Sequence, residues 1–347
     1  MVTNELNIVF ASNKFYLPHM ATCIASIFIN AAPTSIIKIH ILHSSITLEE
    51  QNEILSLLKL SKNNLSIIEF LDLTYIAVPY EVGKYFSIEA MYRLYVVDLF
   101  PDLNKLIYLD CDTIVLTDLN KLLEEDLTHF YLAGVKDFIM MNYSREVGTL
   151  IKGHQINLFE HYNATLNFSH ADFAKYVQSA VIVFNLKKIR QDNKATLMLE
   201  IQEKFPRLLL ADQDIINYSF KGQIKHLSAR WNFGGWSIEE AIKDQDEKKL
   251  LLTSKEHKEF KDAMKNPYII HYVGSHKPSR HSKTFNKLYY KLYWVYRQQT
   301  PYKIKNGYLK TIFFLNFFRG YKKRLKKWII NLRKTNNLFL KCRKDKK

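Results

Sequence analysis

The sequence contains few of the residues that cross-link a chain or interrupt it. Its 347 residues include three cysteines, eight prolines and ten glycines. Cys23, Cys111 and Cys342 are far apart and odd in number, so they predict no disulfide framework and fit a reducing compartment. Scarce glycine and proline, no internal repeat of fixed period and 47% hydrophobic residues argue against a fibrous or disordered chain and indicate a substantial core.

Long apolar runs are missing as well. No segment approaches the roughly 20 apolar residues that a membrane-spanning helix requires. The first 13 residues have no basic segment ahead of their short apolar stretch, so they lack the layout of a secretory signal. These absences favour a cytoplasmic protein.

Acidic residues are nearly absent from the C-terminal segment. Residues 303–347 contain sixteen lysines or arginines and one acid, Asp345, and carry +15 of the net charge of +16. Apolar residues recur there at helical spacing, at Phe314, Phe318, Tyr321, Leu325, Trp328 and Leu332. This pattern predicts a basic amphipathic helix lying on an anionic membrane surface. A helix packed on the body is the alternative, and nucleic-acid binding is less favoured because the body is nearly neutral and contains no recognisable nucleic-acid module.

The rest of the chain alternates the periodicities of strands and helices. Strands are predicted at residues 6–11, 36–42, 65–71, 106–109, 131–135, 176–186 and 267–272. Helices are predicted at residues 16–29, 48–60, 87–100, 195–205, 212–220 and 282–298. Residues 140–170 lack a clear period and are expected to form loops or short helices of a lid or acceptor-binding region. Alternating strands and helices indicate an α/β fold with a mostly parallel sheet, whose ligands bind at the carboxyl ends of the strands.

The tripeptide Asp110-Cys111-Asp112 follows the apolar strand 106–109. In an extended strand the two carboxylates would point to the same side. Paired carboxylates suit Mg²⁺ or Mn²⁺, and such an ion could neutralise a diphosphate leaving group. Carboxylates after a strand also commonly cap the next turn or helix, so the motif alone leaves both interpretations open.

Six segments in a fixed order make the interpretation more specific. They are residues 7–11, 92–94, 106–112, 181–188, 212–217 and 271–278. Together they resemble the family 8 glycosyltransferases, especially the bacterial enzymes that add glucose or galactose to lipopolysaccharide. The resemblance covers roughly residues 6–280 and implies a catalytic domain at residues 1–280. The charge and apolar spacing of the C-terminal segment then predict a helical, basic, membrane-associating region at residues 281–347.

The resemblance implies a GT-A fold, which is a Rossmann-like, mostly parallel mixed sheet flanked by helices. It also implies UDP-glucose or UDP-galactose as the donor and a divalent ion, usually Mn²⁺, with Mg²⁺ as the alternative. Asp110, Asp112 and His271 match the family's metal ligands, and two carboxylates with one imidazole suit Mn²⁺ better than Mg²⁺. Taken alone, His271 would more readily be an ordinary histidine near a strand end.

Further residues match the family's donor-binding and catalytic positions. The donor-binding positions are Ala11, Asn13, Arg93, Asp110, Cys111, Asp112, Gly274 and Lys277, and the catalytic ones are Gln213, Asp212 and Asp137. The resemblance implies that Lys277 contacts the diphosphate and that Asp137 contacts the transferred sugar. It also implies that Gln213 lies near the anomeric carbon. An amide is a poor nucleophile, so we expect Gln213 to position and polarise during attack from the face of the leaving group. Without the resemblance, Lys277 would be an ordinary solvated lysine and Asp137 a residue that caps a loop. Asp212 and Gln213 would belong to a helix N-terminus enriched in acids.

Two positions depart from the family pattern. Gln178-Ser179-Ala180 replaces the usual Asn-Ala-Gly or Asn-Ser-Gly, which leaves the sugar preference open, and Asn13 replaces an aspartate. The expected function is therefore a retaining hexosyltransferase that transfers glucose or galactose to a lipid-linked glycan, and lipopolysaccharide core is the expected acceptor. The alternatives are a capsule or protein glycosyltransferase, or a catalytically silent membrane- or nucleic-acid-binding relative. No specific nucleic-acid partner is expected, and the location would be cytoplasmic, peripheral on the inner face of the membrane.

Overall fold

The computed structural model describes residues 5–78, 87–143, 150–151, 154–155, 157–206, 208–234, 252–274, 277–278 and 287–303. The chain divides by its contacts into two units, Met1–Tyr302 and Lys303–Lys347. The predicted basic tail helix lies outside the described residues. None of the described helices is both long enough and apolar enough to cross a bilayer.

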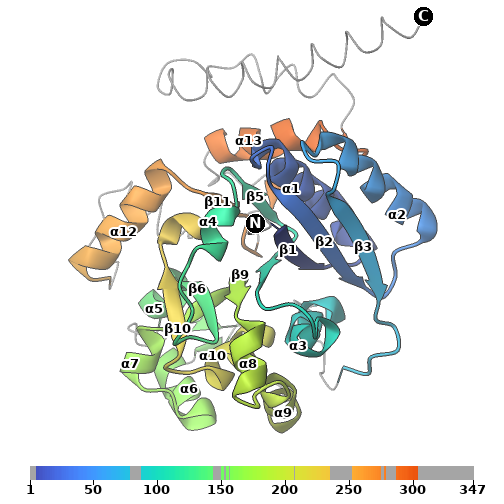
Figure 1. Cartoon of the computed structure of the whole chain (residues 1–347). Coiled ribbons are helices and arrows are strands. Elements are labelled where there is room, and N and C mark those ends of the chain that lie inside the picture. The colour runs from blue at the N-terminus through green and yellow to red at the C-terminus, as the bar shows by residue number, and fades with distance from the viewer. Residues whose placement is uncertain are drawn as a thin grey trace, which may run out of the picture. The chain divides into compact units, whose positions relative to one another are not determined.

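A seven-stranded mixed sheet forms the centre of the first unit (Figure 1). Its strand order is β10-β6-β9-β4-β1-β2-β3. The strands are β1 Glu5–Ala11, β2 Ile36–His43, β3 Ile67–Asp72, β4 Leu106–Leu109, β6 Leu132–Lys136, β9 Val177–Phe184 and β10 Ile224–Leu227. All neighbours pair in parallel except that β9 runs antiparallel to β4 and to β6. The predicted mostly parallel α/β fold is confirmed.

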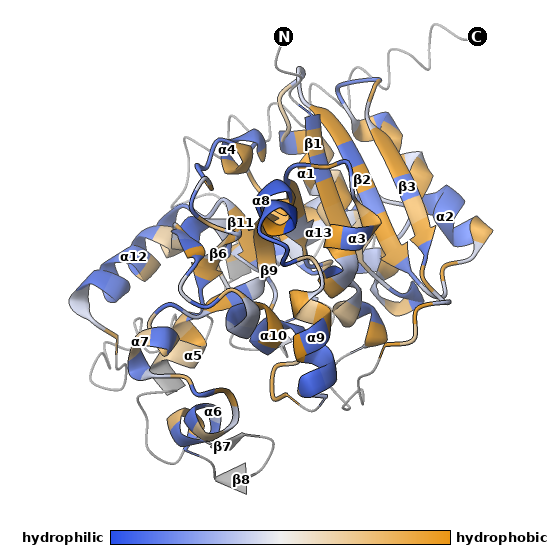
Figure 2. Cartoon of the chain, turned by 60° about the horizontal axis from the view of Figure 1, so that its bottom comes forward, coloured by the Kyte–Doolittle hydropathy of each residue, from blue (hydrophilic) through white to orange (hydrophobic). Residues whose placement is uncertain are grey.

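Strands β1 and β2 are formed mainly by β-branched and other apolar residues that are buried on both faces, whereas β3, at the edge of the sheet, is only partly buried. Residues 8–10 of β1 are completely buried, as are most residues of β2. Figure 2 shows this apolar character along β1, β2 and β3, whereas α2 (Leu48–Leu55) and α12 (Ser254–Lys265) are largely hydrophilic. Near-continuous apolar runs are what a parallel sheet covered on both faces requires.

Helices cover the two faces of the sheet. The longer ones are α1 Leu17–Asn30, α6 Leu158–Leu166, α9 Leu197–Lys204, α10 Asp212–Ser219 and α13 Lys287–Arg297. The shorter ones are α3 Val96–Leu99, α4 Asn120–Leu123, α5 Phe138–Tyr143, α7 His170–Phe173 and α8 Leu186–Gln191. The 3₁₀ segments are η1 Lys14–Tyr16, η2 Ser56–Leu60, η3 Ile88–Tyr95 and η4 Ala229–Trp231.

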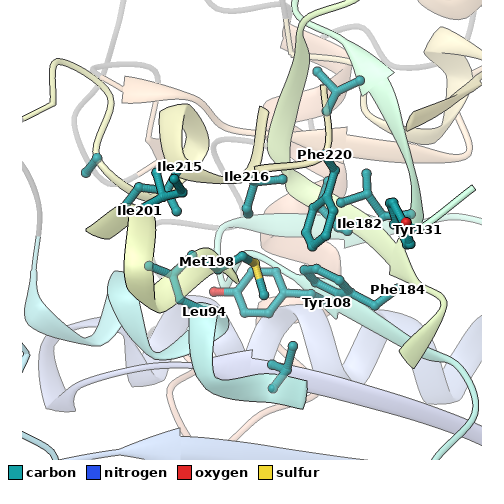
Figure 3. Close-up of a cluster of buried hydrophobic side chains, with 14 of the residues drawn as sticks. Leu94, Tyr108, Tyr131, Ile182, Phe184, Met198, Ile201, Ile215, Ile216 and Phe220 are labelled. Atoms are coloured by element: carbon teal, nitrogen blue, oxygen red, sulfur yellow. The ribbon is translucent and has the colours of Figure 1, made fainter. Parts of the chain in front are cut away.

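One large apolar cluster fixes α9, α10 and η3 on one face of the sheet (Figure 3). Tyr108 from β4 and Ile182 from β9 meet Met198 of α9 and Ile216 of α10, and all four side chains are at most 1% exposed. Alternate strand residues point to the opposite face, which α1 covers. The cluster therefore holds the first turn of α10, which carries predicted site residues, against the central strands.

Several of the predicted elements differ from the structure, among them the predicted helix 48–60, which forms α2 and then η2. Residues 87–100, predicted as one helix, form the 3₁₀ segment η3 followed by the short helix α3. The predicted strand 267–272 is shortened to β11 Ile269–His271 and pairs outside the main sheet with β5 Thr113–Val115. Residues 140–170 contain short helices, as expected, and the two-residue strands β7 Leu150–Ile151 and β8 His154–Gln155.

Helix α13 packs against α1, although it lies beyond the expected domain boundary at residue 280. The Tyr293 hydroxyl lies 2.8 Å from His19 Nδ1, and Asn30 Nδ2 donates to the Tyr296 hydroxyl at 2.7 Å. Both tyrosines are at most 1% exposed. The first structural unit therefore includes α13 and ends at Tyr302.

Candidate active site

The carboxyl edge of the sheet gathers the predicted site residues. Ala11 ends β1, Asp110 follows β4 and Asp137 follows β6, and these three strands point the same way. Since β9 is antiparallel, its first residues, including Gln178, lie at this same edge. The Asp110 N–H donates to the Ala180 carbonyl oxygen at 2.8 Å, which connects the acidic motif directly to β9.

Asp110, Asp112 and His271 form a compact group of potential metal ligands. One ligand atom from each lies within 4.8 Å of the others. His271 Nε2 is 3.3 Å from Asp112 Oδ1 and 3.8 Å from Asp110 Oδ2. The acidic motif is a turn and not the extended strand considered above, because β4 ends at Leu109 and the Thr113 hydroxyl donates to the Asp110 carbonyl oxygen at 2.9 Å. The two carboxylates converge on the histidine nevertheless.

The small β5–β11 sheet explains how a distant histidine reaches the motif. His271 pairs with Thr113 across this sheet, and the Tyr272 N–H donates to the Asp112 carbonyl oxygen at 3.0 Å. Burial lowers the pKa of His271 to about 4, so its imidazole is neutral at pH 7. A neutral imidazole beside two carboxylates is a donor set that a divalent transition-metal ion accepts.

Arg93 is the buried cation of the site. It donates to Asp110 Oδ1 at 2.8 Å and to the Ser179 carbonyl oxygen at 2.9 Å, and it forms an ion pair with Asp212 at 3.2 Å. Its guanidinium carbon lies 4.2 Å from the centre of the Tyr108 ring. Burial raises the pKa of Asp110, but Arg93, His271 and Lys277 outweigh it and lower the pKa overall. Arg93 therefore keeps Asp110 ionised and oriented toward His271.

Lys277 supplies a second cation on the other side of the cluster. Its ammonium group forms an ion pair with Asp112 and lies 5.3 Å from the centre of the Tyr16 ring. Gly274, three positions before Lys277, has a φ of +60°, a conformation that glycine adopts without strain. Lys277 thus places a positive charge beside the carboxylates of Asp110 and Asp112.

Gln213 and Asp137 form a second polar group next to the metal-ligand cluster. Gln213 Nε2 donates to Asp137 Oδ2 at 3.1 Å, and the Ser179 N–H donates to Gln213 Oε1 at 3.2 Å. Burial raises the pKa of Asp137 and of Asp212, although Arg93 counteracts it at Asp212. Ala211, just before these α10 residues, has φ 49° and ψ −118°, which is a rare conformation for a residue with a side chain. This turn presents Asp212 and Gln213 to the sheet edge.

The end of β1 lies close to the acidic motif. The Cys111 thiol donates to the Ala11 carbonyl oxygen at 3.3 Å, and burial raises the pKa of this thiol to about 12, so it stays protonated. Asn13 accepts from the Phe15 N–H at 3.1 Å and donates to Glu89 Oε2 at 3.1 Å. The asparagine that departs from the family pattern is therefore held by a buried glutamate that sequence reasoning missed.

A small cleft opens beside Asp137 and Gln178. Its wall includes Phe138, Asn232, Phe233 and Phe260. Aromatic walls with a few polar groups are typical of sites that bind small ligands. No sequence pattern marked Asn232, Tyr108 or Glu89 as site residues, because their roles depend on contacts between segments far apart in the chain.

Asp214, the residue after Gln213, is a completely buried acid at the same helix start. Its Oδ1 accepts from the hydroxyls of Tyr162 at 2.8 Å and Tyr176 at 2.5 Å, and its Oδ2 accepts from the Leu210 N–H at 2.8 Å. Burial raises its pKa to about 6. Asp214 thereby connects α6 and β9 to the turn that carries Gln213.

This raised pKa predicts a specific pH dependence. Between about pH 4 and pH 6 the folded protein holds the Asp214 proton more tightly than the unfolded chain does, so the stability from this group falls as the pH rises. Relative to Asp214→Asn, the wild-type free energy of unfolding should fall by about 2–3 kcal/mol from pH 4 to pH 7. Urea unfolding of both proteins across this range tests it, and parallel pH profiles would contradict it.

The mixed sheet with an acid–histidine cluster at its carboxyl edge is the GT-A fold of glycosyltransferases, and solved structures support this. WbbM, a bifunctional glycosyltransferase, matches with a TM-score of 0.72 at 22% identity, over 89% of this chain and 51% of WbbM. This chain therefore spans about half of WbbM. The galactosyltransferase LgtC, solved with donor and acceptor sugar analogs, matches with a TM-score of 0.66 at 20% identity, over 88% of this chain and 100% of LgtC.

The chain belongs to glycosyl transferase family 8, whose sequence model matches residues 7–281. A curated relative, general stress protein A of Bacillus subtilis, is 24% identical over 282 residues, which are 79% of this chain and 87% of that protein. The matched residues include every predicted site residue. The chain is thus a glycosyltransferase by family, and its fold is that of GT-A glycosyltransferases.

Proposed function

We propose that the protein transfers glucose or galactose from a UDP-sugar to a glycan, with retention of the anomeric configuration, and that the acceptor is lipopolysaccharide core. The observation that supports this most strongly is the convergence of Asp110, Asp112 and His271 at the edge of the sheet where ligands bind. In this proposal they hold Mn²⁺, with Mg²⁺ as the alternative. The ion would supply Lewis-acid stabilisation of the UDP leaving group.

The remaining residues bind and orient the donor in this proposal. Lys277 shifts its ammonium group from Asp112 to the diphosphate, while Arg93 holds Asp110 and Asp212 in place. Asp137 accepts a hydrogen bond from a hydroxyl of the transferred sugar, and Gln213, fixed by Asp137 and Ser179, lies against the anomeric centre. Ala11, Asn13, Cys111 and Gly274 would line the nucleotide.

The chemistry of these side chains favours attack from the face of the leaving group. An amide has no useful pKa for proton transfer and is a weak nucleophile, so we do not propose a covalent bond between Gln213 and the transferred sugar. The bond between the anomeric carbon and the diphosphate oxygen breaks as the acceptor oxygen bonds to the same face of that carbon. The departing diphosphate takes the acceptor's proton.

Donor hydrolysis tests the proposal without knowledge of the acceptor. The full chain is incubated with UDP-glucose or UDP-galactose, with Mn²⁺ or with a chelator, and UDP release is measured. We expect slow release from one of the two sugars, lost on chelation and restored by Mn²⁺. Release that is independent of metal, or no release from either sugar, would contradict the proposal and favour a catalytically silent relative.

We further propose that residues 303–347 hold the enzyme reversibly on the inner face of the cell membrane, near a lipid-linked acceptor. Each basic residue near an anionic leaflet contributes about 1 kcal/mol, so several suffice for salt-sensitive binding. Buried free thiols at Cys23 and Cys111 fit a cytoplasmic location.

Vesicle sedimentation checks this role of the tail. The full chain should sediment with anionic vesicles at low salt, while a chain ending at Tyr302, where the first structural unit ends, should stay in solution. Uncharged vesicles and a single-stranded RNA serve as controls. Equal vesicle binding by both proteins would refute the membrane role, and preferential binding to RNA would favour the nucleic-acid alternative.

A further inference from the structure

The rear of the His271 ring, on the side away from Asp110 and Asp112, contacts two amide side chains. His271 Nδ1 lies 3.2 Å from Gln178 Oε1 and 3.1 Å from Asn232 Oδ1. Asn232 Nδ2 donates to the same Gln178 oxygen at 2.7 Å. His271 and Asn232 are 5% and 7% exposed, and Gln178 is partly buried.

These contacts determine which ring nitrogen carries the proton. A neutral imidazole has one N–H donor and one acceptor nitrogen. Both ring nitrogens face acceptors: Nδ1 lies 3.1 and 3.2 Å from amide oxygens, and Nε2 lies 3.3 and 3.8 Å from carboxylate oxygens of Asp112 and Asp110, which are already paired with Lys277 and Arg93. The closer contacts at Nδ1 favour the proton on that nitrogen, and the lone pair of Nε2 then points toward the two carboxylates. The Gln178 oxygen accepts from Asn232 Nδ2 and lies beside His271 Nδ1, and the Asn232 oxygen lies beside the same nitrogen. Each of the three side chains therefore restrains the other two.

The backbone around Asn232 holds this arrangement against β11. The Phe233 N–H donates to the Ile269 carbonyl oxygen at 2.9 Å, and the His271 N–H donates to the Phe233 carbonyl oxygen at 2.8 Å. A Cβ atom on Gly234 would lie 2.6 Å from the His271 carbonyl oxygen, so only glycine allows this close approach. Asn232 and His271 therefore lie on two segments fixed side by side.

We propose that Gln178 and Asn232 are positioning residues that fix His271 as the Nδ1–H tautomer and direct its Nε2 toward the divalent ion. The inference rests on the proposed function in that it assumes a metal at Asp110, Asp112 and His271. Partners behind a ligating histidine set its tautomer and orientation, and their loss typically weakens metal binding by about 10–100-fold. Gln178, which stands where the family usually has asparagine, thus orients His271 in this chain.

Nitrogen NMR of the metal-free full chain with ¹⁵N-labelled histidine reads the tautomer directly. His271→Gln identifies the signal. We expect the Nδ1–H form in the wild type and a loss of that preference in the double variant Gln178→Leu/Asn232→Leu. An Nε2–H form in the wild type would overturn the inference. This measurement requires no metal and no turnover.

Calorimetric titration with Mn²⁺ alone gives a second readout. Gln178→Leu removes the acceptor and should weaken Mn²⁺ binding by about 10-fold, whereas Gln178→Glu keeps a carboxylate acceptor and should stay within about 3-fold of wild type. Gln191→Leu, at the exposed end of α8, is the matched control and should match wild type. Wild-type affinity in Gln178→Leu, or equal loss in both Gln178 variants, would overturn the inference. If the wild type binds no Mn²⁺, the proposed function fails while the tautomer measurement still decides the inference.

Discussion

Asp112→Asn is expected to lower UDP release from the donor by about 10³-fold, because it removes one of two carboxylates facing His271 Nε2. Asparagine keeps the size of the side chain but neither its charge nor its affinity for a hard cation. The ion pair with Lys277 is lost as well. Mn²⁺ titration should show a parallel loss of affinity.

The control for this change is Asp102→Asn, which removes a carboxylate from an exposed turn before β4. That variant should release UDP at the wild-type rate. Circular dichroism and thermal melting show whether Asp112→Asn retains the fold. A folded Asp112→Asn protein with full, metal-dependent activity would exclude the assigned role of the carboxylate.

Arg93→Met should lower the free energy of unfolding by about 3–5 kcal/mol, since breaking a buried ion pair leaves charge without compensation. The Arg93 side chain is 6% exposed, and it neutralises Asp212, which is 5% exposed, together with Asp110. Methionine fills similar space but donates no hydrogen bond, and the Ser179 carbonyl oxygen also loses its donor. Urea unfolding at pH 7 measures the effect.

A second substitution separates loss of charge balance from loss of packing. Asp212→Asn in the Arg93→Met background removes one of the uncompensated carboxylates, so it should restore part of the lost stability. Lys188→Met, which removes a partly exposed cation from an i,i+4 ion pair with Asp192, should cost less than about 1 kcal/mol. An Arg93→Met protein as stable as Lys188→Met would show that Arg93 does not hold the site together.

The sequence predicted the central elements well because their patterns are local. The apolar strands β1, β2 and β4 and helix α1 follow from periodicity, and the order of the strand and helix segments indicated the sheet. Elements whose burial depends on distant segments were harder to predict. The 3₁₀ segment η3 is one case, because it buries Glu89 and Arg93 along with apolar residues.

The site shows the same division between local and distant information. Asp110 and Asp112 stand in one motif, whereas His271 joined them only through the family resemblance, because the β5–β11 pairing that brings it close leaves no local signal. Gln178 was noticed only as a departure from the family pattern. Its contact with His271 depends on Asn232, which no motif marks, and the strained turn at Ala211 lies in a segment whose sequence contains no glycine.

The most direct test of the central claim is anomalous scattering from a crystal soaked with Mn²⁺ and UDP. We predict one manganese peak within about 2.0–2.3 Å of a carboxylate oxygen of Asp110, a carboxylate oxygen of Asp112 and His271 Nε2, with the diphosphate completing the coordination. A peak elsewhere, or bound UDP without manganese between these three side chains, would contradict the account.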